Sequence, residues 1–353
     1  MPIESEPIGS IPRPVYLVEP ILSGNQPPEL MYDKALAETV QRFIETGSKV
    51  ITDGEQLKPS FLTYPIQGSN QLQGGGVEIP FADNHKRQLP VLSGQNLPFK
   101  YNRYAREYLD KCRQCATGDC LIKVPIISAS AMSLLYPMDR EIPGYPRTAF
   151  IADMLNEVEK DIRKALEGGA HVVQIDATEL RLSLKLDPSG ALLRSFVDLN
   201  NQVFNRFTPE ERAKLGIHTC PGGDMDSTHS ADIDYLSLLP TLFNINVKRF
   251  YLQYASEIDR KRVLECVREN VKPDQLLFFG VTDVINPRVE TAEEVCDTIL
   301  EISKYIPINQ IGTTDDCGFS PFCDDQSTSR DIAFAKIKAR IDGTRMAEQH
   351  LGL

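Results

Sequence analysis

The feature that most constrains this chain is a regular alternation of short apolar segments, rich in β-branched residues, with longer segments of helical periodicity. The short segments are PIGSIP, KVITDGE, IKVPIIS, HVVQIDA, LGIHTC, RFYLQYA, LLFFGVTD and NQIGTTDDC. Segments such as DKALAETVQRFIETG and TAEEVCDTILEISKYI lie between them, and an amphipathic segment follows the last. Repeated strand–helix units build parallel sheets, and eight such units can close into a barrel. We therefore expect an α/β fold, a (β/α)8 TIM barrel that spans residues 1–353 as a single domain.

One stretch interrupts this alternation directly after the second expected strand. Residues 57–98 are rich in Gly, Pro, Gln and Asn and include QGSNQLQGGGVEIPF. Long irregular segments within compact domains tend to serve function. We expect a loop or hairpin insertion over 57–98 that covers the barrel mouth as a lid, with a mobile surface loop as the alternative.

The charge balance and the amino terminus bear on partners and location. A net charge of −11 and a pI of about 5.1 oppose binding to a phosphate backbone. No apolar segment approaches the roughly 20 residues of a membrane helix, and MPIESEPIGS lacks the pattern of a secretory signal. We expect a cytoplasmic protein that binds neither nucleic acid nor membranes.

Polar residues close most of the expected strands, at the end of a barrel where active sites lie. The candidates are Ser10, Glu55, Asp176, His218, Cys220, Gln253, Asp283 and Cys317. Asp176 and Asp283 are the candidate catalytic carboxylates among them.

The fifth expected strand ends in His218-Thr219-Cys220, and the eighth ends in Asp316-Cys317. Residues i and i+2 of a strand point to the same face, so His218 and Cys220 can both face the barrel axis. One imidazole and two thiolates suit Zn²⁺, and three protein ligands leave a fourth position open, as in catalytic zinc sites. A satisfied core histidine and packed thiols are the alternative.

A second cysteine cluster competes for the role of metal site. Cys112, Cys115 and Cys120 lie in CRQCATGDC, which contains a C-x2-C half-site. No second half-site follows at zinc-finger spacing. We expect a thiol-rich surface helix or turn, and a structural metal or a redox pair is the alternative.

Taken in order, these strand ends resemble the catalytic barrel of the cobalamin-independent methionine synthase family. The resemblance rests on IGSIPRP, TDGE, VVQID, HTC, GVTDVINPR and DDCGF. It implies zinc held by His218, Cys220 and Cys317, which activates a small-molecule thiol for attack on an alkyl donor. It also implies that Ser10, Glu55 and Asp176 bind the amino-acid end of that thiol.

The chain departs from the family pattern at several positions. Gln253 stands where the family has a further zinc-ligating Glu, Ala177-Thr178 replaces Glu-Pro, Ile285 replaces a His, and the chain has no Trp. A neutral amide is a poorer zinc ligand than a carboxylate, so Gln253 is expected to contact substrate or to bind zinc only weakly. The departures also predict that methyltetrahydrofolate is a poor donor.

Three other functions compete with a thiol alkyltransferase. The first is a C–S lyase or transferase that adds a thiol to an epoxide, similar to the epoxyalkane:coenzyme M transferases. The second is a metal-free barrel related to uroporphyrinogen decarboxylase, in which Arg13 and the aspartates bind a polyacid. The third is a non-catalytic binding barrel. Stoichiometric zinc separates the first from the second.

Overall fold

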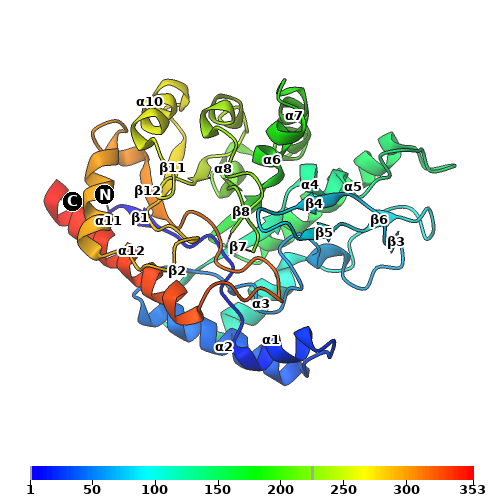
Figure 1. The fold of residues 1–353 in the computed structure, drawn as a ribbon, viewed down its shortest axis with the longest axis horizontal. Coiled ribbons are helices and arrows are strands. Elements are labelled where there is room, and N and C mark those ends of the chain that lie inside the picture. The colour runs from blue at the N-terminus through cyan, green and yellow to red at the C-terminus, as the bar shows by residue number, and fades with distance from the viewer. Residues whose placement is uncertain (1, 224–225) are drawn as a thin grey trace.

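A computed structural model of the chain describes residues 2–223 and 226–353. Parallel strands form one sheet in the order β1-β12-β11-β10-β9-β8-β7-β2, which curves into a barrel (Figure 1). The strands are β1 Glu4–Ser5, β2 Val50–Ile51, β7 Leu121–Ile127, β8 Val172–Asp176, β9 Leu215–Thr219, β10 Arg249–Leu252, β11 Leu276–Gly280 and β12 Ile311–Thr314. The predicted TIM barrel is confirmed.

Loops after β1 and β2, the two ends of this order, close the barrel. The amide of Ile11 donates to the Gly54 carbonyl at 3.0 Å, and the Thr52 hydroxyl donates to the Gly9 carbonyl at 2.8 Å. The first strand was predicted at residues 7–12, but the sheet pairing lies earlier, at Glu4–Ser5. Proline at position 7 has no N–H to donate, so the ladder does not continue into the predicted segment.

Helices pack outside the barrel and join successive strands (Figure 1). They are α1 Val15–Leu22, α2 Glu29–Glu45, α3 Ala105–Cys115, α4 Ala129–Ser133, α5 Arg147–Glu167, α6 Glu179–Leu186, α7 Ala191–Phe204, α8 Pro209–Arg212, α9 Leu239–Leu242, α10 Arg260–Asn270, α11 Ala292–Ile302 and α12 Arg330–Leu351. Short 3-10 turns lie at Tyr64–Ile66, Tyr235–Ser237 and Ile308–Gln310. Within the described part of the chain, no helix has the length and apolar character needed to span a bilayer.

The cysteine-rich segment begins on α3. Cys112 is buried on that helix, whereas Cys115 and Cys120 are partly exposed, and all three are free thiols. The groups of potential metal ligands found among residues 2–223 and 226–353 do not include these three.

The insertion at 57–98 contains two small antiparallel strand pairs, and the strands of one lie between the strands of the other in the sequence. One pairs β3 (Leu72–Gln73) with β6 (Val91–Leu92), and the other pairs β4 (Glu78–Pro80) with β5 (Lys86–Gln88). Figure 1 shows both strand pairs on the side of the barrel away from the two chain termini. The β4–β5 hairpin contributes residues to the cavity described below.

Charged groups join three strands inside the barrel, at the end opposite the carboxyl ends of the strands. Glu6, which follows β1 and is fully buried, accepts hydrogen bonds from Arg249 and Tyr251 of β10. Lys123 of β7 lies 3.4 Å from the Glu6 carboxylate and 3.6 Å from the centre of the Tyr251 ring. These contacts fix β1 against strands on the far side of the barrel.

Two glycines make room for aromatic rings in the barrel interior. Tyr251 and Phe278 stack at 4.8 Å between ring centroids. A Cβ added to Gly216 would lie 2.6 Å from the Tyr251 ring, and one added to Gly312 would lie 2.5 Å from the Phe278 ring. Real Cβ atoms do not approach so closely, so these strands need glycine opposite the rings.

We predict that Gly312→Ala lowers the free energy of unfolding by about 1–3 kcal/mol, the usual cost of overpacking a well-filled core. The matched control is Gly74→Ala, because a Cβ added to Gly74 meets no atom within 4 Å. Urea denaturation of the two variants and the parent protein gives the comparison. Equal midpoints for Gly312→Ala and Gly74→Ala would contradict this account of the interior.

Candidate metal centre and substrate cavity

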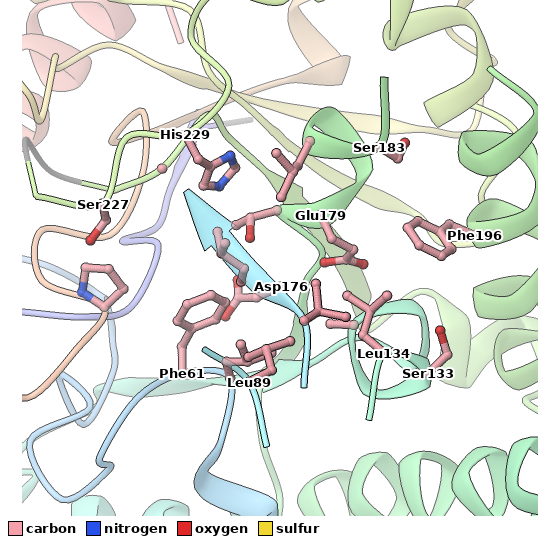
Figure 2. A pocket seen from close by; sticks show the side chains of 18 of the residues that line it. Phe61, Leu89, Ser133, Leu134, Asp176, Glu179, Ser183, Phe196, Ser227 and His229 are labelled. Atoms are coloured by element: carbon pink, nitrogen blue, oxygen red, sulfur yellow. The ribbon is translucent and has the colours of Figure 1, made fainter. Parts of the chain in front are cut away.

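A cavity of about 670 Å³ opens where the strands end, and it gathers residues from distant parts of the chain (Figure 2). Residues predicted for the site that line it are Ser10, Glu55, Asp176, His218 and Cys317. Parallel strands bring their carboxyl ends to one edge, which explains why positions more than 300 residues apart meet here. Gln253 and Asp283 lie outside the lining of this cavity.

Three potential metal ligands come together beside the cavity. One ligand atom from each of His218, Cys220 and Cys317 lies within 4.8 Å of the others, and all three side chains are buried. His218 belongs to β9, Cys220 follows that strand directly, and Cys317 follows β12. The donor set of one nitrogen and two sulfurs is typical of zinc sites with an open position.

The sulfur atoms of Cys220 and Cys317 are in contact, as in a disulfide, and their Cα atoms are 6.0 Å apart. A disulfide between the two cysteines and a metal bound by both require the same approach of the two strand ends. The geometry therefore fits an oxidised pair or a reduced pair that shares one ion, and the redox state decides between them.

Asp176 orients the imidazole of His218. The two residues are register partners on β8 and β9, and the His218 Nδ1 atom lies 2.9 Å from an Asp176 carboxylate oxygen. The carboxylate makes Nδ1 the protonated nitrogen, which leaves the Nε2 lone pair available for a ligand. Nε2 is buried and has no hydrogen-bond partner among the described residues. This carboxylate–histidine arrangement is the usual support for a histidine that binds a metal.

Glu55 presents a carboxylate to the cavity with one unsatisfied oxygen. It is 2 % exposed, its Oε1 lies 3.6 Å from the Lys58 ammonium, and its Oε2 is buried without a hydrogen-bond partner. Burial raises the pKa of Glu55 to about 7, and the Lys58 ammonium opposes that shift. A buried, unpaired carboxylate oxygen in a cavity is a natural seat for a ligand cation.

Ser10 is held against the loop that carries Cys317. Its hydroxyl accepts a hydrogen bond from the Ser320 amide at 3.1 Å, and a side chain at Gly318 would overlap the Ser10 oxygen. Arg13 reinforces this junction, because its guanidinium donates to the backbone carbonyls of Glu55 and Ser320. Arg13 is therefore engaged with backbone and does not line the cavity, so it does not present the anion-binding group of a polyacid decarboxylase.

Gln253 is turned toward Arg181. The Gln253 carbonyl oxygen accepts a hydrogen bond from Arg181 at 2.8 Å, and its amide nitrogen donates to the Ser256 hydroxyl at 2.6 Å. Asp316 fixes the surrounding loop by accepting from the amides of Tyr254 and Ser256. The Gln253 oxygen, which is the atom that could bind a metal ion, is thus directed toward Arg181.

Asp283 lines a second, polar cavity of about 480 Å³, together with Asn286 and Glu290. Its carboxylate accepts hydrogen bonds from the amides of Ile285 and Asn286, and its own amide donates to Glu290. These bonds are typical of a residue that caps a loop. Asp283 does not belong to the group of potential metal ligands formed by His218, Cys220 and Cys317.

Two residues that sequence reasoning passed over line the main cavity. Glu179 begins α6 and lies between Asp176 and Phe196 in Figure 2. Burial raises the pKa of Glu179 to about 7. His229 is 8 % exposed, its Nδ1 has no partner among the described residues, and burial lowers its pKa to about 4. No spacing signal marks either residue, because only the packing of other elements buries them.

Comparisons with known proteins agree with this architecture. A family model described as the catalytic domain of cobalamin-independent synthase matches residues 91–330, which is more than half of the chain. A methionine synthase of Saccharolobus solfataricus is 23% identical over 356 residues, which cover 98% of this chain and 94% of that protein. A methionine synthase of Sulfurisphaera tokodaii is 22% identical over 353 residues, which cover 98% of this chain and 92% of that protein.

Solved structures share the fold. A B12-independent methionine synthase from Shewanella sp. W3-18-1, in complex with selenomethionine, superposes with a TM-score of 0.76 at 17% identity and 99% coverage of both chains. A putative vitamin-B12 independent methionine synthase from Listeria monocytogenes superposes with a TM-score of 0.69 at 18% identity and 98% coverage of both. Because the family model extends over β7 to β12 and includes the His218, Cys220 and Cys317 cluster, this chain belongs to the cobalamin-independent methionine synthase family.

Proposed function

We propose that this protein is a zinc-dependent thiol alkyltransferase of the methionine synthase type, with the metal held by His218, Cys220 and Cys317. The single observation that carries the proposal is the buried cluster of His218, Cys220 and Cys317, whose ligand atoms lie within 4.8 Å of one another. Asp176 engages Nδ1 of His218, and the Nε2 atom has no partner among the described residues. The relatives named as methionine synthases support transfer of a methyl group to a thiol as the reaction type.

The residues at the site fit zinc better than harder metals, because thiolates and imidazole are its preferred ligands. Bound zinc would lower the pKa of a substrate thiol, which is mostly protonated at neutral pH, and so provide a thiolate nucleophile. The chain itself then has to orient the thiol, exclude water and receive the alkyl donor.

Glu55, Asp176 and Ser10 are proposed to bind the amino-acid end of the thiol. The unpartnered oxygen of Glu55 can accept a hydrogen bond from an ammonium group, and Asp176 adds a second carboxylate on the same cavity. A protein of similar fold was solved with selenomethionine, an amino acid with a chalcogen in its side chain. Asp283 and Gln253 receive no role in catalysis or substrate binding in this proposal, because neither residue lines the cavity.

We also propose that the β4–β5 hairpin of the 57–98 insertion covers the cavity as a lid. Val77, Ile79 and Phe81, which lie in or beside β4, line the cavity together with the barrel residues. A lid excludes water, and water would otherwise compete for a reactive thiolate and its electrophile.

The first prediction is that the reduced protein binds one zinc per chain and that Cys220→Ser or Cys317→Ser removes most of it. Each substitution replaces a thiolate by a hydroxyl, which is a poor zinc ligand. Elemental analysis after dialysis with a phosphine reductant gives the stoichiometry, because a Cys220–Cys317 disulfide would prevent binding.

The matched control is Cys266→Ser, which changes a free, partly exposed thiol on α10. Gln253→Ala serves as a second control, because the Gln253 oxygen is bonded to Arg181. Both variants should keep full zinc content. Full zinc in both Cys220→Ser and Cys317→Ser would rule out the proposed ligands.

The second prediction concerns Glu55. Glu55→Gln should weaken binding of homocysteine by about tenfold or more, since a hydrogen bond between charged groups contributes roughly 1.5–3 kcal/mol. Binding of 4-mercaptobutyrate, which has the thiol and the carboxylate but no ammonium, should change little. Calorimetric titration of the zinc-loaded proteins with both thiols measures the difference.

The same pair of thiols gives the pH dependence. The pKa of Glu55 is raised to about 7, so its carboxylate is present above pH 7 and lost as the pH falls below it. The preference for homocysteine over 4-mercaptobutyrate should therefore decrease below pH 7 in the parent protein and stay flat in Glu55→Gln. An equal preference at all pH values in the parent protein would show that Glu55 does not bind the ammonium.

A further inference from the structure

Beyond the thiol site, the cavity extends into a region with an apolar wall. Its lining includes Phe61 and Ile79 from the insertion, Leu134 and Met138 from the segment around α4, Leu182 of α6 and Phe196 of α7. Figure 2 shows Leu134 and Phe196 on the side of Glu179 away from Ser227 and His229. A wall of this kind gains free energy by removing apolar ligand surface from water.

The charged side chains that line the cavity as a whole are almost all acidic. Carboxylates lining the cavity are those of Glu55, Glu78, Asp176, Glu179 and Asp198, whereas Arg147 is the one Lys or Arg side chain among the described lining residues. Arg147 donates to the Pro137 carbonyl and lies over the Tyr136 ring. The cavity therefore offers no cluster of cations to receive a carboxylate tail or a phosphate.

His229 does not supply the missing positive charge. Burial lowers the pKa of His229 to about 4, so its imidazole is neutral at pH 7. It contacts the Phe81 ring edge to face at 6.3 Å and thus belongs to the apolar wall on the side of the insertion.

Glu179 is the polar group set into this wall. The hydroxyls of Ser128 and Ser130 both donate to its Oε1, and Ser130 in turn accepts from the Asn200 amide. Burial raises the pKa of Glu179 to about 7, although the two serine hydroxyls oppose this shift, and the negative charge of Asp176 adds to it. A protonated carboxyl group is thus accessible near neutral pH, and such a group can donate a hydrogen bond to a ligand.

We propose that the second substrate of this enzyme is an uncharged, mainly apolar molecule, and that Glu179 donates a hydrogen bond to its one polar atom. This inference rests on the proposed function, because it assigns the alkyl donor or electrophile that meets the thiol. The polar atom of this second substrate would lie between Glu179 and Asp176, next to the sulfurs of Cys220 and Cys317. Its hydrocarbon part would fill the space between α4, α6 and α7.

Electrostatics and desolvation both disfavour a polyanionic donor such as a folate with its glutamate tail. Each carboxylate of the tail would lose its hydration and would face the acidic side chains that line the cavity, which carry the same charge. The absence of Trp from the chain also removes the largest aromatic surface on which a pterin ring could stack.

Three probes test the proposal by binding alone. 2-Phenylethyl methyl ether is neutral and carries one acceptor, butylbenzene has nearly the same shape without an acceptor, and folic acid is a polyanion. Ligand-observed NMR titrations of the zinc-loaded protein should give the tightest binding for the ether, weaker binding for the hydrocarbon and the weakest for folic acid.

Two substitutions of Glu179 separate hydrogen bonding from packing. Glu179→Ala should weaken ether binding about threefold to tenfold, as expected for one lost hydrogen bond, and should leave butylbenzene binding within twofold. Glu179→Gln retains a donor at nearly the same position and should keep ether binding close to that of the parent. Leu134→Ala should weaken both neutral probes, and Leu30→Ala, at an exposed position on α2, should affect neither.

Three results would overturn the inference. They are tighter binding of folic acid than of the ether, equal loss of both neutral probes in Glu179→Ala, and no binding of either neutral probe at its solubility limit. Circular dichroism melts identify any variant that fails to fold, and Glu179→Gln, which is nearly isosteric, then carries the test. The zinc content of the same samples is measured as well. A protein that binds the ether but holds no zinc would contradict the proposed function alone. A protein that holds zinc but does not bind the ether would contradict this inference alone.

Discussion

The hydrogen bond between Asp176 and His218 is the contact on which the site depends. It joins adjacent strands at paired positions, so the barrel register itself sets the direction of the imidazole. Because Nδ1 is committed to Asp176, Nε2 is left as the acceptor, and it has no partner among the described residues. A shift of β8 against β9 by one residue would turn Asp176 to the outer face of the barrel and break this contact. The strand register and the geometry of the proposed metal site are thereby linked through one pair of strands.

The sequence was sufficient to predict the barrel and the core of the site, because both follow from simple periodicities. Alternation along a strand placed His218 and Cys220 on one face, and the rule for parallel strands brought Cys317 to the same end. The contacts of Gln253 and Asp283 could not be predicted in this way. Their backbone positions are at strand ends as expected, but local competition by Arg181 and by loop amides decides where their polar atoms point.

Burial accounts for what could not be predicted. Glu179 lies in a segment, ELRLSL, that reads as an ordinary amphipathic helix start. Burial raises its pKa against the opposing hydrogen bonds from Ser128 and Ser130, and burial by distant segments leaves no mark on local spacing. The cavity thus combines a polar, anionic end near the sulfurs with an apolar end under the insertion.

The central claim is that His218, Cys220 and Cys317 bind one zinc ion that keeps an open position. X-ray absorption at the zinc edge, recorded on the reduced, zinc-loaded protein, tests it most directly because the method reports the ligand atoms themselves. The account predicts two sulfur ligands at about 2.3 Å and one imidazole nitrogen at about 2.0 Å, with a light atom in the remaining position. A shell made only of nitrogen and oxygen atoms would contradict it.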